Sequence, residues 1–165
     1  MVKLDLLTYL DEKMKEQFHD VEWTIEWYKK EKNITLYFSL FAEISDDAAE
    51  IADIEGTIAE NEVIEFEDSL VFFDPEKSKI EATEDYLQVI PFSLKKGLEI
   101  GYLETLLAYL KDVLDEGQSD LLDFVTNPDI EEFELNWDDA SFEARLAQAK
   151  LETKYDQTFI PYPKF

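Results

Sequence analysis

The sequence predicts an α+β fold: a mostly antiparallel sheet of about five to six strands, with an N-terminal helix, a long central helix and a C-terminal helix packed mainly on one face. Several segments alternate apolar and polar residues with the period of two that half-buried strands show. These segments follow one another without a helix between each pair, whereas a parallel sheet needs alternating strands and helices. An antiparallel sheet beside separate helices fits both observations.

Segment 93–117 predicts the central helix, against which we expect the sheet to pack. Ser93 is a candidate N-cap and Gly117 a candidate C-terminal glycine. Burial of its aliphatic face contributes on the order of 9–18 kcal/mol before the loss of conformational entropy. The residues of that face recur at steps of three and four: Leu103, Leu106, Leu107, Leu110, Val113 and Leu114.

The first elements follow in order. Residues 3–18 predict the N-terminal helix from apolar steps of three or four, and residues 21–27 alternate as a half-buried strand. A polar turn covers 29–33, where Asn33 suits a left-handed backbone conformation. Residues 34–44 predict a long strand. Because both faces of this strand carry bulky side chains, we expect it at the centre of the sheet, packed against the long helix.

The middle of the chain is less regular. Segment 45–61 is compatible with a short helix capped by Asp46 or with an irregular acidic loop. Residues 62–75 predict another strand, and residues 85–92 a further one. Because Pro91 cannot donate a ladder hydrogen bond, it indicates an edge strand or the exit to the long helix.

After the long helix, residues 120–125 predict a short helix and residues 130–137 an alternating strand. Asp138 or Asp139 can cap a last, alanine-rich helix. We expect a single domain over residues 1–152 and an extended aromatic tail over residues 153–165, which prolines interrupt. The sequence leaves open whether this tail docks on the domain.

Charge is the extreme property of the chain. It has 40 acidic and 15 basic residues, for a formal net charge of −25. Residues 41–90 hold 16 acidic against 2 basic residues, and residues 91–140 hold 13 against 3. Such a field repels nucleic acid and anionic lipid, and Arg145 is the only arginine. We therefore expect no direct nucleic-acid binding.

The residue inventory excludes several kinds of site. The chain has no cysteine, which excludes disulfides, thiolate metal sites and a cysteine nucleophile. His19 is the only histidine, so we expect neither a multi-histidine metal site nor a catalytic triad. We expect His19 to interact with the C-terminal end of the first helix. Without a glycine-rich phosphate loop, we also expect no cofactor.

The N-terminal segment has no apolar run long enough for a signal peptide, and no segment approaches a membrane span. We therefore expect a cytoplasmic protein that does not bind membranes. Gly97 and Gly101 lie four residues apart in a charged segment, so we expect them to permit close packing of the backbone rather than to mark a membrane dimer.

An acidic cluster between Glu60 and Asp74 could supply oxygen ligands to a hard cation. The spacing of an EF-hand loop is absent, and Glu65 and Glu67 alternate with apolar residues as the solvent side of a strand does. We favour solvated surface, although cation binding stays open. The cluster comprises Glu60, Glu62, Glu65, Glu67, Asp68 and Asp74.

Aromatic residues outside the predicted core are the candidates for an interaction surface, because exposed aromatic side chains are favoured at interfaces. The alternative is that helices or the tail itself cover them. Three lie on the sheet face opposite Trp23, Trp27 and Phe38, and three lie in the tail. The candidates are Tyr28, Tyr37, Phe41, Phe159, Tyr162 and Phe165.

Three stretches carry a resemblance to a known family: VIEFEDSLVFFDPEKS, DYLQVIPFSLKKGLEIGYLETLLAYLKDVLDEGQSDLLDF and FELNWDDASFE. With them the chain resembles, over roughly residues 3–150, a domain-of-unknown-function family of small acidic cytoplasmic proteins from low-GC Gram-positive bacteria. The resemblance implies a bacterial, intracellular protein. It carries no active site to transfer.

Three hypotheses about function follow. The leading one is a non-enzymatic protein-interaction module that binds a partner through acidic and aromatic surfaces. The second is a nucleic-acid mimic whose carboxylates imitate phosphates and occupy a DNA-binding protein. The third is a hydrolase that uses a divalent metal or paired carboxylates. Because 40 acidic residues guarantee coincidental pairs, the sequence favours a protein that is not an enzyme. It does not predict the oligomeric state.

Overall fold

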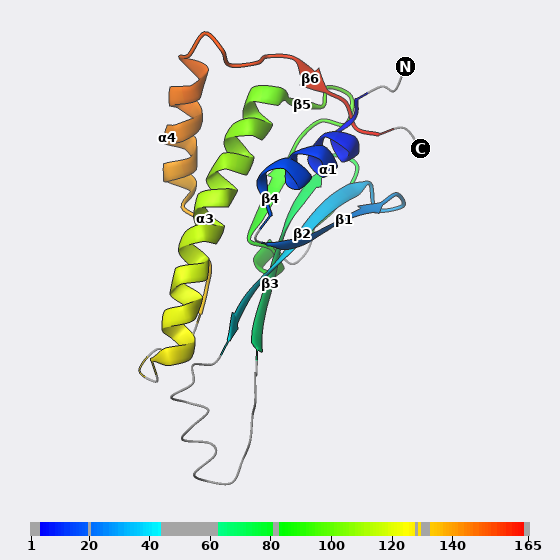
Figure 1. Ribbon diagram of the computed structural model, residues 1–165. Coiled ribbons are helices and arrows are strands. Elements are labelled where there is room, and N and C mark those ends of the chain that lie inside the picture. Colours follow the sequence, from blue (N-terminus) through cyan, green and yellow to red (C-terminus); the bar gives the residue numbers. More distant parts are fainter. Residues whose placement is uncertain are drawn as a thin grey trace, which may run out of the picture.

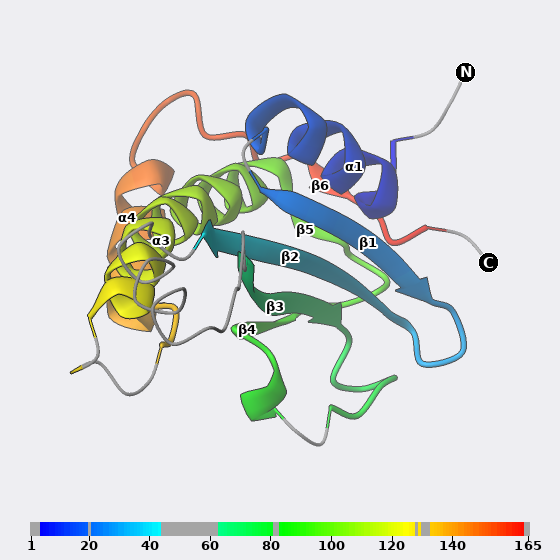
Figure 2. The ribbon, with the colours of Figure 1, turned by 60° about the horizontal axis from the view of Figure 1, so that its bottom comes forward.

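The structure is a computed structural model that describes residues 4–19, 21–43, 63–80, 83–127, 129 and 133–163. Its centre is a four-stranded sheet in the order β1–β2–β3–β4, shown in Figure 2. The first three strands are antiparallel, and β4 runs parallel to β3. The bounds are β1 Glu22–Tyr28, β2 Asn33–Glu43, β3 Val63–Phe73 and β4 Gln88–Pro91.

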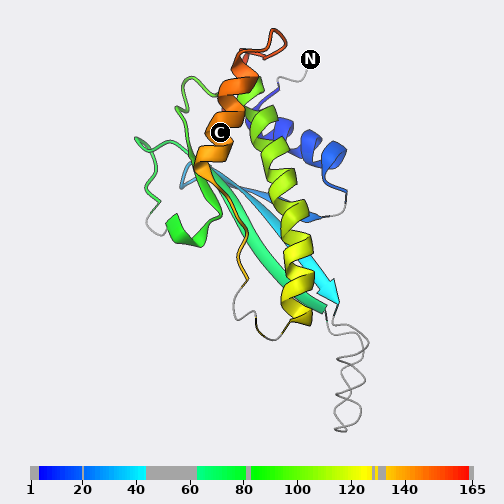
Figure 3. The same ribbon diagram turned by 90° about the vertical axis from the view of Figure 1, so that its left-hand side faces the viewer.

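Two helices pack on one face of this sheet (Figure 1): α1 (Leu6–Gln17) and α3 (Ile100–Thr126). A third helix, α4 (Asp139–Lys150), packs against α3. The connection from β3 to β4, which contains the 3₁₀ turn η1 (Thr83–Asp85), lies on the opposite side of the sheet (Figure 3). A separate two-stranded ladder joins β5 (Leu98–Glu99) to β6 (Phe159–Ile160).

The hydrophobic core lies between the sheet and the helices, where the predicted apolar faces of the two layers meet. The sheet residues that face the helices include Leu36, Phe38 and Leu70, each at most 1% exposed. The predicted apolar face of α3 is confirmed, because Leu103, Leu106, Leu107, Leu110, Val113 and Leu114 are all buried. The expected central strand, β2, lies between β1 and β3 and contacts α3. The sheet and the long helix are therefore the two packed layers, as expected.

The sheet itself corrects the prediction. It is mixed and has four strands, not an antiparallel sheet of five to six. Residues 133–137 form no strand, although 130–137 was predicted to be one. Their alternating side chains pack elsewhere: Leu135 lies against Gly117 of α3, and the ring of Phe133 contacts Phe66. The alternating residues of this segment therefore pack on α3 and on β3 without pairing as a strand.

The long helix also differs from its prediction. It begins at Ile100 instead of near Ser93, because Gly97 adopts a φ of +81° and the next two residues form β5. Gly117 does not end it. A Cβ at Gly117 would lie 2.3 Å from a methyl group of Leu135, so glycine makes room within the helix. The helix continues to Thr126 and includes the predicted short helix.

The hairpin turn and the N-terminal helix are close to their predictions. Lys32, with a φ of 55°, holds the left-handed position expected for Asn33. Asn33 is buried instead, and its Oδ1 accepts a hydrogen bond from Thr35 Oγ1. The cap of α1 is Asp5, whose carboxylate accepts a bond from the Thr8 amide at 2.8 Å. Segment 45–61 lies outside the described residues.

The C-terminal strap, residues 155–162, docks on the domain. Its β6 pairs with β5, and Ile160 and Tyr162 are buried. The predicted close packing at Gly97 and Gly101 is confirmed here. A Cβ at Gly97 would lie 2.0 Å from the Ile160 carbonyl oxygen, and one at Gly101 would lie 2.4 Å from the Tyr155 ring.

Candidate functional site

The sheet face that points away from the helices carries polar side chains from three strands. In the ladder register, Glu22 of β1, Ser39 of β2 and Glu67 of β3 form one row across the sheet. Thr24 and Tyr37 belong to the next row. Period-two alternation puts these residues here because their neighbours in sequence fill the core. We call Glu22, Thr24, Tyr37, Ser39, Glu65 and Glu67 the acidic face.

These residues line an open hollow of about 460 Å³. Ser39, only 8% exposed, lies at its floor, while the carboxylates of β1 and β3 are exposed on either side. Glu22 and Glu67 are separated by two strand spacings, about 10 Å between their backbones. This is wide for a shared cation, whose oxygen ligands lie at about 2.0–2.6 Å. Within the described residues, no three His, Asp or Glu side chains could hold a metal ion.

The three sheet aromatics proposed from sequence lie on this same face. The hydroxyls of Tyr28 and Tyr37 are 2.6 Å apart, and Tyr28 is 37% exposed. Burial and the hydrogen bond to Tyr28 raise the pKa of Tyr37 well above its ordinary value. Phe41, half-buried, pairs across the ladder with Glu65. The structure therefore brings an aromatic pair and a phenylalanine beside the carboxylates.

The tail aromatics do not join them. Phe159 is 52% exposed, but it lies on β6, paired with Glu99 at the start of α3. Tyr162 is buried: its hydroxyl accepts a hydrogen bond from the Trp27 indole at 2.6 Å, and the two rings meet edge to face. Phe165 lies outside the described residues.

The acidic cluster of the sequence divides in the structure. Glu65 and Glu67 are exposed on the acidic face, as predicted for the solvent side of a strand. Asp68, on the opposite face of β3, is half-buried, and this burial raises the pKa of its carboxyl. Asp74 is buried in the turn after β3. Glu60 and Glu62 lie outside the described residues. Of the four described members, only Glu65 and Glu67 share a face, so the four do not converge on one point.

Asp74 holds that turn together. Its two carboxylate oxygens accept hydrogen bonds from the Glu76 amide and, twenty residues further along, the Leu94 amide, each at 2.9 Å. The bond from Leu94 chiefly holds the pKa of Asp74 below its ordinary value, with the bond from Glu76 adding to it. Asp74 therefore links the end of β3 to the segment that leads into β5, which is a structural role.

Replacing Asp74 by asparagine is expected to destabilise the protein by about 1–3 kcal/mol at pH 7, because an amide cannot accept both bonds as the carboxylate does. A lowered folded-state pKa gives stability that is complete above the unfolded pKa, about 3.9, and lost as the pH falls through the folded value. The difference between wild type and variant should therefore shrink below about pH 4. Urea unfolding at several pH values measures it.

The exposed Asp85 of the same connection provides the control. Asp85→Asn removes the same charge without touching the turn, so its effect should stay within about 0.5 kcal/mol. Equal losses in the two variants would show that net charge, and not the two hydrogen bonds, accounts for the stability.

The single histidine and the single arginine of the sequence also form structural contacts. His19 donates from Nε2 to the Glu16 carbonyl at 2.8 Å, at the C-terminal end of α1, which confirms its predicted position. Arg145 of α4 forms an ion pair with Asp112 of α3 at 2.8 Å, and its guanidinium lies 5.1 Å from the centre of the Tyr109 ring. The only arginine thus joins two helices.

Sequence reasoning named the aromatics of this face but missed the row of Glu22, Ser39 and Glu67. A signal was present. The hairpin closes with the pair Tyr28 and Asn33, and counting outward from that pair places Glu22 opposite Ser39. The position of Glu67 could not be counted in this way, because segment 44–62 separates β2 from β3.

Comparison with known proteins agrees with the resemblance found in the sequence. The family described as "Protein of unknown function (DUF3013)" matches residues 1–164. A crystal structure of a conserved protein of unknown function from Enterococcus faecalis is similar, with a TM-score of 0.82 and 41% identity over 99% of this chain and 98% of that one. No curated protein matches. Within the described part of the chain, no helix is both long and apolar enough to cross a membrane.

Proposed function

We propose that this chain, which belongs to the DUF3013 family of proteins of unknown function, is a non-enzymatic interaction module. Its acidic face binds an extended segment of a partner protein that carries lysine or arginine side chains. The observation that carries this proposal is the hollow of about 460 Å³, which has carboxylates on both sides and hydroxyl groups between them.

Electrostatics favour a cationic partner. Among the described residues, the hollow is lined by Glu22, Glu65 and Glu67 and by no basic side chain. The net charge of −25 adds a long-range attraction for basic segments, which speeds their encounter. Within the described residues, the only arginine is engaged between two helices, so it does not compete for these carboxylates.

Geometry favours a side chain over a bare ion. Glu22 of β1 lies about 10 Å, two strand spacings, from the carboxylates of β3. This distance leaves room for a hydrated ammonium or guanidinium group, or for an extended backbone. Tyr37 borders the hollow, so its ring can meet a cation, an interaction worth about 0.5–1 kcal/mol at exposed sites. Hydroxyls of Thr24 and Ser39 can accept or donate to a peptide backbone.

The test is the affinity for an extended lysine-rich peptide, measured by calorimetry. Changing Glu22 and Glu67 together to glutamine should weaken binding about tenfold, because each exposed ion pair contributes up to about 1 kcal/mol. Binding by the wild type should also weaken as salt is raised through the physiological range, because solvent-exposed charges are screened.

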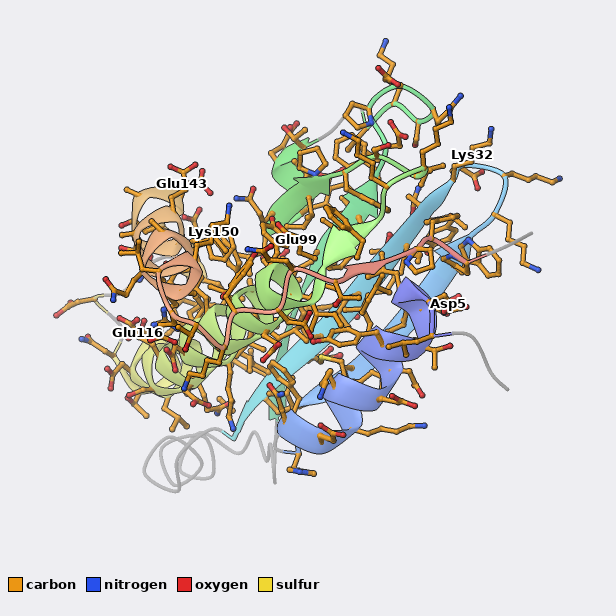
Figure 4. All side chains as sticks on the ribbon, turned by 90° about the horizontal axis from the view of Figure 1, so that it is seen from above. Asp5, Lys32, Glu99, Glu116, Glu143 and Lys150 are labelled. Carbon is orange, nitrogen blue, oxygen red and sulfur yellow. The ribbon has the colours of Figure 1, made fainter. Side chains whose placement is uncertain are left out.

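A matched control removes the same charge elsewhere. Glu116 of α3 and Glu143 of α4 are exposed on the helical side of the molecule (Figure 4). The double change Glu116→Gln with Glu143→Gln should leave the affinity within about twofold of wild type. If the two double variants lose affinity equally, the peptide responds only to net charge, and the acidic face is not the binding site.

Two further expectations belong with this proposal. We infer that the protein is bacterial, since its similar structure comes from a bacterium, and that it acts in the cytoplasm, as the family resemblance of its sequence implies. The described residues offer no specific observation in favour of a nucleic-acid mimic or a hydrolase.

A further inference from the structure

The C-terminal strap accepts hydrogen bonds from three elements that are distant in sequence. The Leu6 amide of α1 donates to the Pro161 carbonyl at 2.8 Å. The first two amides of α3, Ile100 and Gly101, donate to strap carbonyls at 2.9 and 2.8 Å. The fourth donor is the Trp27 indole of β1, which bonds to the Tyr162 hydroxyl. Figure 4 shows the strap passing the labelled Glu99 and Asp5, at the starts of α3 and α1.

The three amides are the donors that a helix cannot satisfy itself. Amides in the first turn of an α-helix have no carbonyl four residues earlier within the helix. Glu99, at the N-cap position of α3, makes no side-chain cap. The strap carbonyls of Thr158 and Asp156 therefore do for α3 what a capping side chain does elsewhere.

The surroundings are shaped to receive the strap. The missing side chains of Gly97 and Gly101 leave space for the Ile160 backbone and the Tyr155 ring. Ile160 and Tyr162 are buried among core residues. Residues 151–154 separate the strap from α4, so the strap can leave without unfolding the helix before it.

We propose that the C-terminal strap is a latch: it docks and releases as one unit. Its release removes the acceptors of the first amides of α1 and α3 together with the Tyr162 acceptor of the Trp27 indole. The sheet and the body of α3 stay folded in the released state, because they keep the core contacts that they make with each other. Release exposes the aromatic side chain of Tyr162 in one segment with Phe159. The latch does not depend on the proposed function of the acidic face.

Hydrogen exchange of the full chain, followed by NMR, tests the latch. The variant Tyr162→Phe removes the hydroxyl group that accepts the indole bond and keeps the ring. Because the strap moves as one unit, all four protons should exchange faster in this variant, each by about the same factor of at least roughly three. If only the Trp27 indole proton exchanges faster, the four bonds open independently and the latch is wrong.

A disulfide lock gives the opposite perturbation. Glu99 and Phe159 are directly paired in the ladder, where opposed Cα atoms lie about 4.5–5.5 Å apart, within disulfide range. The chain has no cysteine of its own, so Glu99→Cys with Phe159→Cys can form one bridge only. Oxidation should slow the four protons at least about tenfold relative to the reduced form of the same protein.

The Ala140 amide is the internal control. It lies in the first turn of α4 and bonds to the Asp138 carboxylate at 3.3 Å, away from the strap, so the lock should not change its exchange. Unchanged exchange of the four strap-bound protons on oxidation would overturn the latch. Failure of the two thiols to form the bridge would also overturn it, because the docked register brings them together.

Discussion

Replacing Gly97 by alanine is expected to destabilise the protein by about 2–5 kcal/mol. A Cβ in the left-handed region costs about 1–2 kcal/mol, and overpacking adds about 1–3 kcal/mol. Both apply at Gly97, where φ is +81° and the added carbon would lie 2.0 Å from the Ile160 carbonyl oxygen. Because the obstacle is backbone, no side-chain rotation relieves it, and the strap must move. The midpoint of urea unfolding measures the loss.

Gly101 provides the matched comparison. Its conformation is helical, and the added carbon would meet the Tyr155 ring, a side chain that can rotate. Gly101→Ala should therefore cost less than Gly97→Ala. On a Tyr155→Ala background, Gly101→Ala should become neutral or favourable by up to about 1 kcal/mol, the helix propensity of alanine over glycine. An unfolding midpoint unaffected by Gly97→Ala would contradict the docked strap.

The second large effect is expected in α3. Leu110 is fully buried between the helix and the sheet, so Leu110→Ala should cost about 2–5 kcal/mol through lost burial and the cavity left behind. Leu122, in the same helix, is 45% exposed. Leu122→Ala should change stability by no more than about 0.5 kcal/mol. Comparable losses at the two positions would show that α3 does not pack on the sheet through its predicted face.

Local sequence patterns correctly predicted the two strands of the first hairpin, the buried face of the long helix and the cap of the last helix. Alternation predicts β1 and β2, because each strand has one face against the helices and the turn between them is short. The steps of Leu103 to Leu114 predict which side of α3 is buried. The aspartate expected to cap α4 does so, since Asp138 accepts a bond from the Ala140 amide.

The wrong predictions concern segments whose packing or pairing partners are not their neighbours in sequence. Gly117 was predicted to end the long helix, yet it lies within the helix and leaves space for Leu135. Residues 133–137 alternate like a strand, but Phe133 and Leu135 pack on other elements. The parallel pairing of β4 was also missed, although the 14-residue connection 74–87 is long enough for a crossover.

The candidate site was foreseen only in part. Tyr28, Tyr37 and Phe41 could be placed on one face by counting along their strands, and the structure puts them there. The burial of Tyr162 could not be predicted, because it depends on Trp27, 135 residues away. The carboxylate row needs the register of β3, which no local signal fixes.

The most direct test of binding on the acidic face is NMR mapping of the protein during titration with the lysine-rich peptide. If the carboxylates of this face receive the cationic side chains, the backbone signals of Glu22, Ser39 and Glu67 should shift most, in one saturable step. Shifts centred instead on Glu116 and Glu143, or small shifts spread evenly over all the acidic residues, would contradict the proposed site.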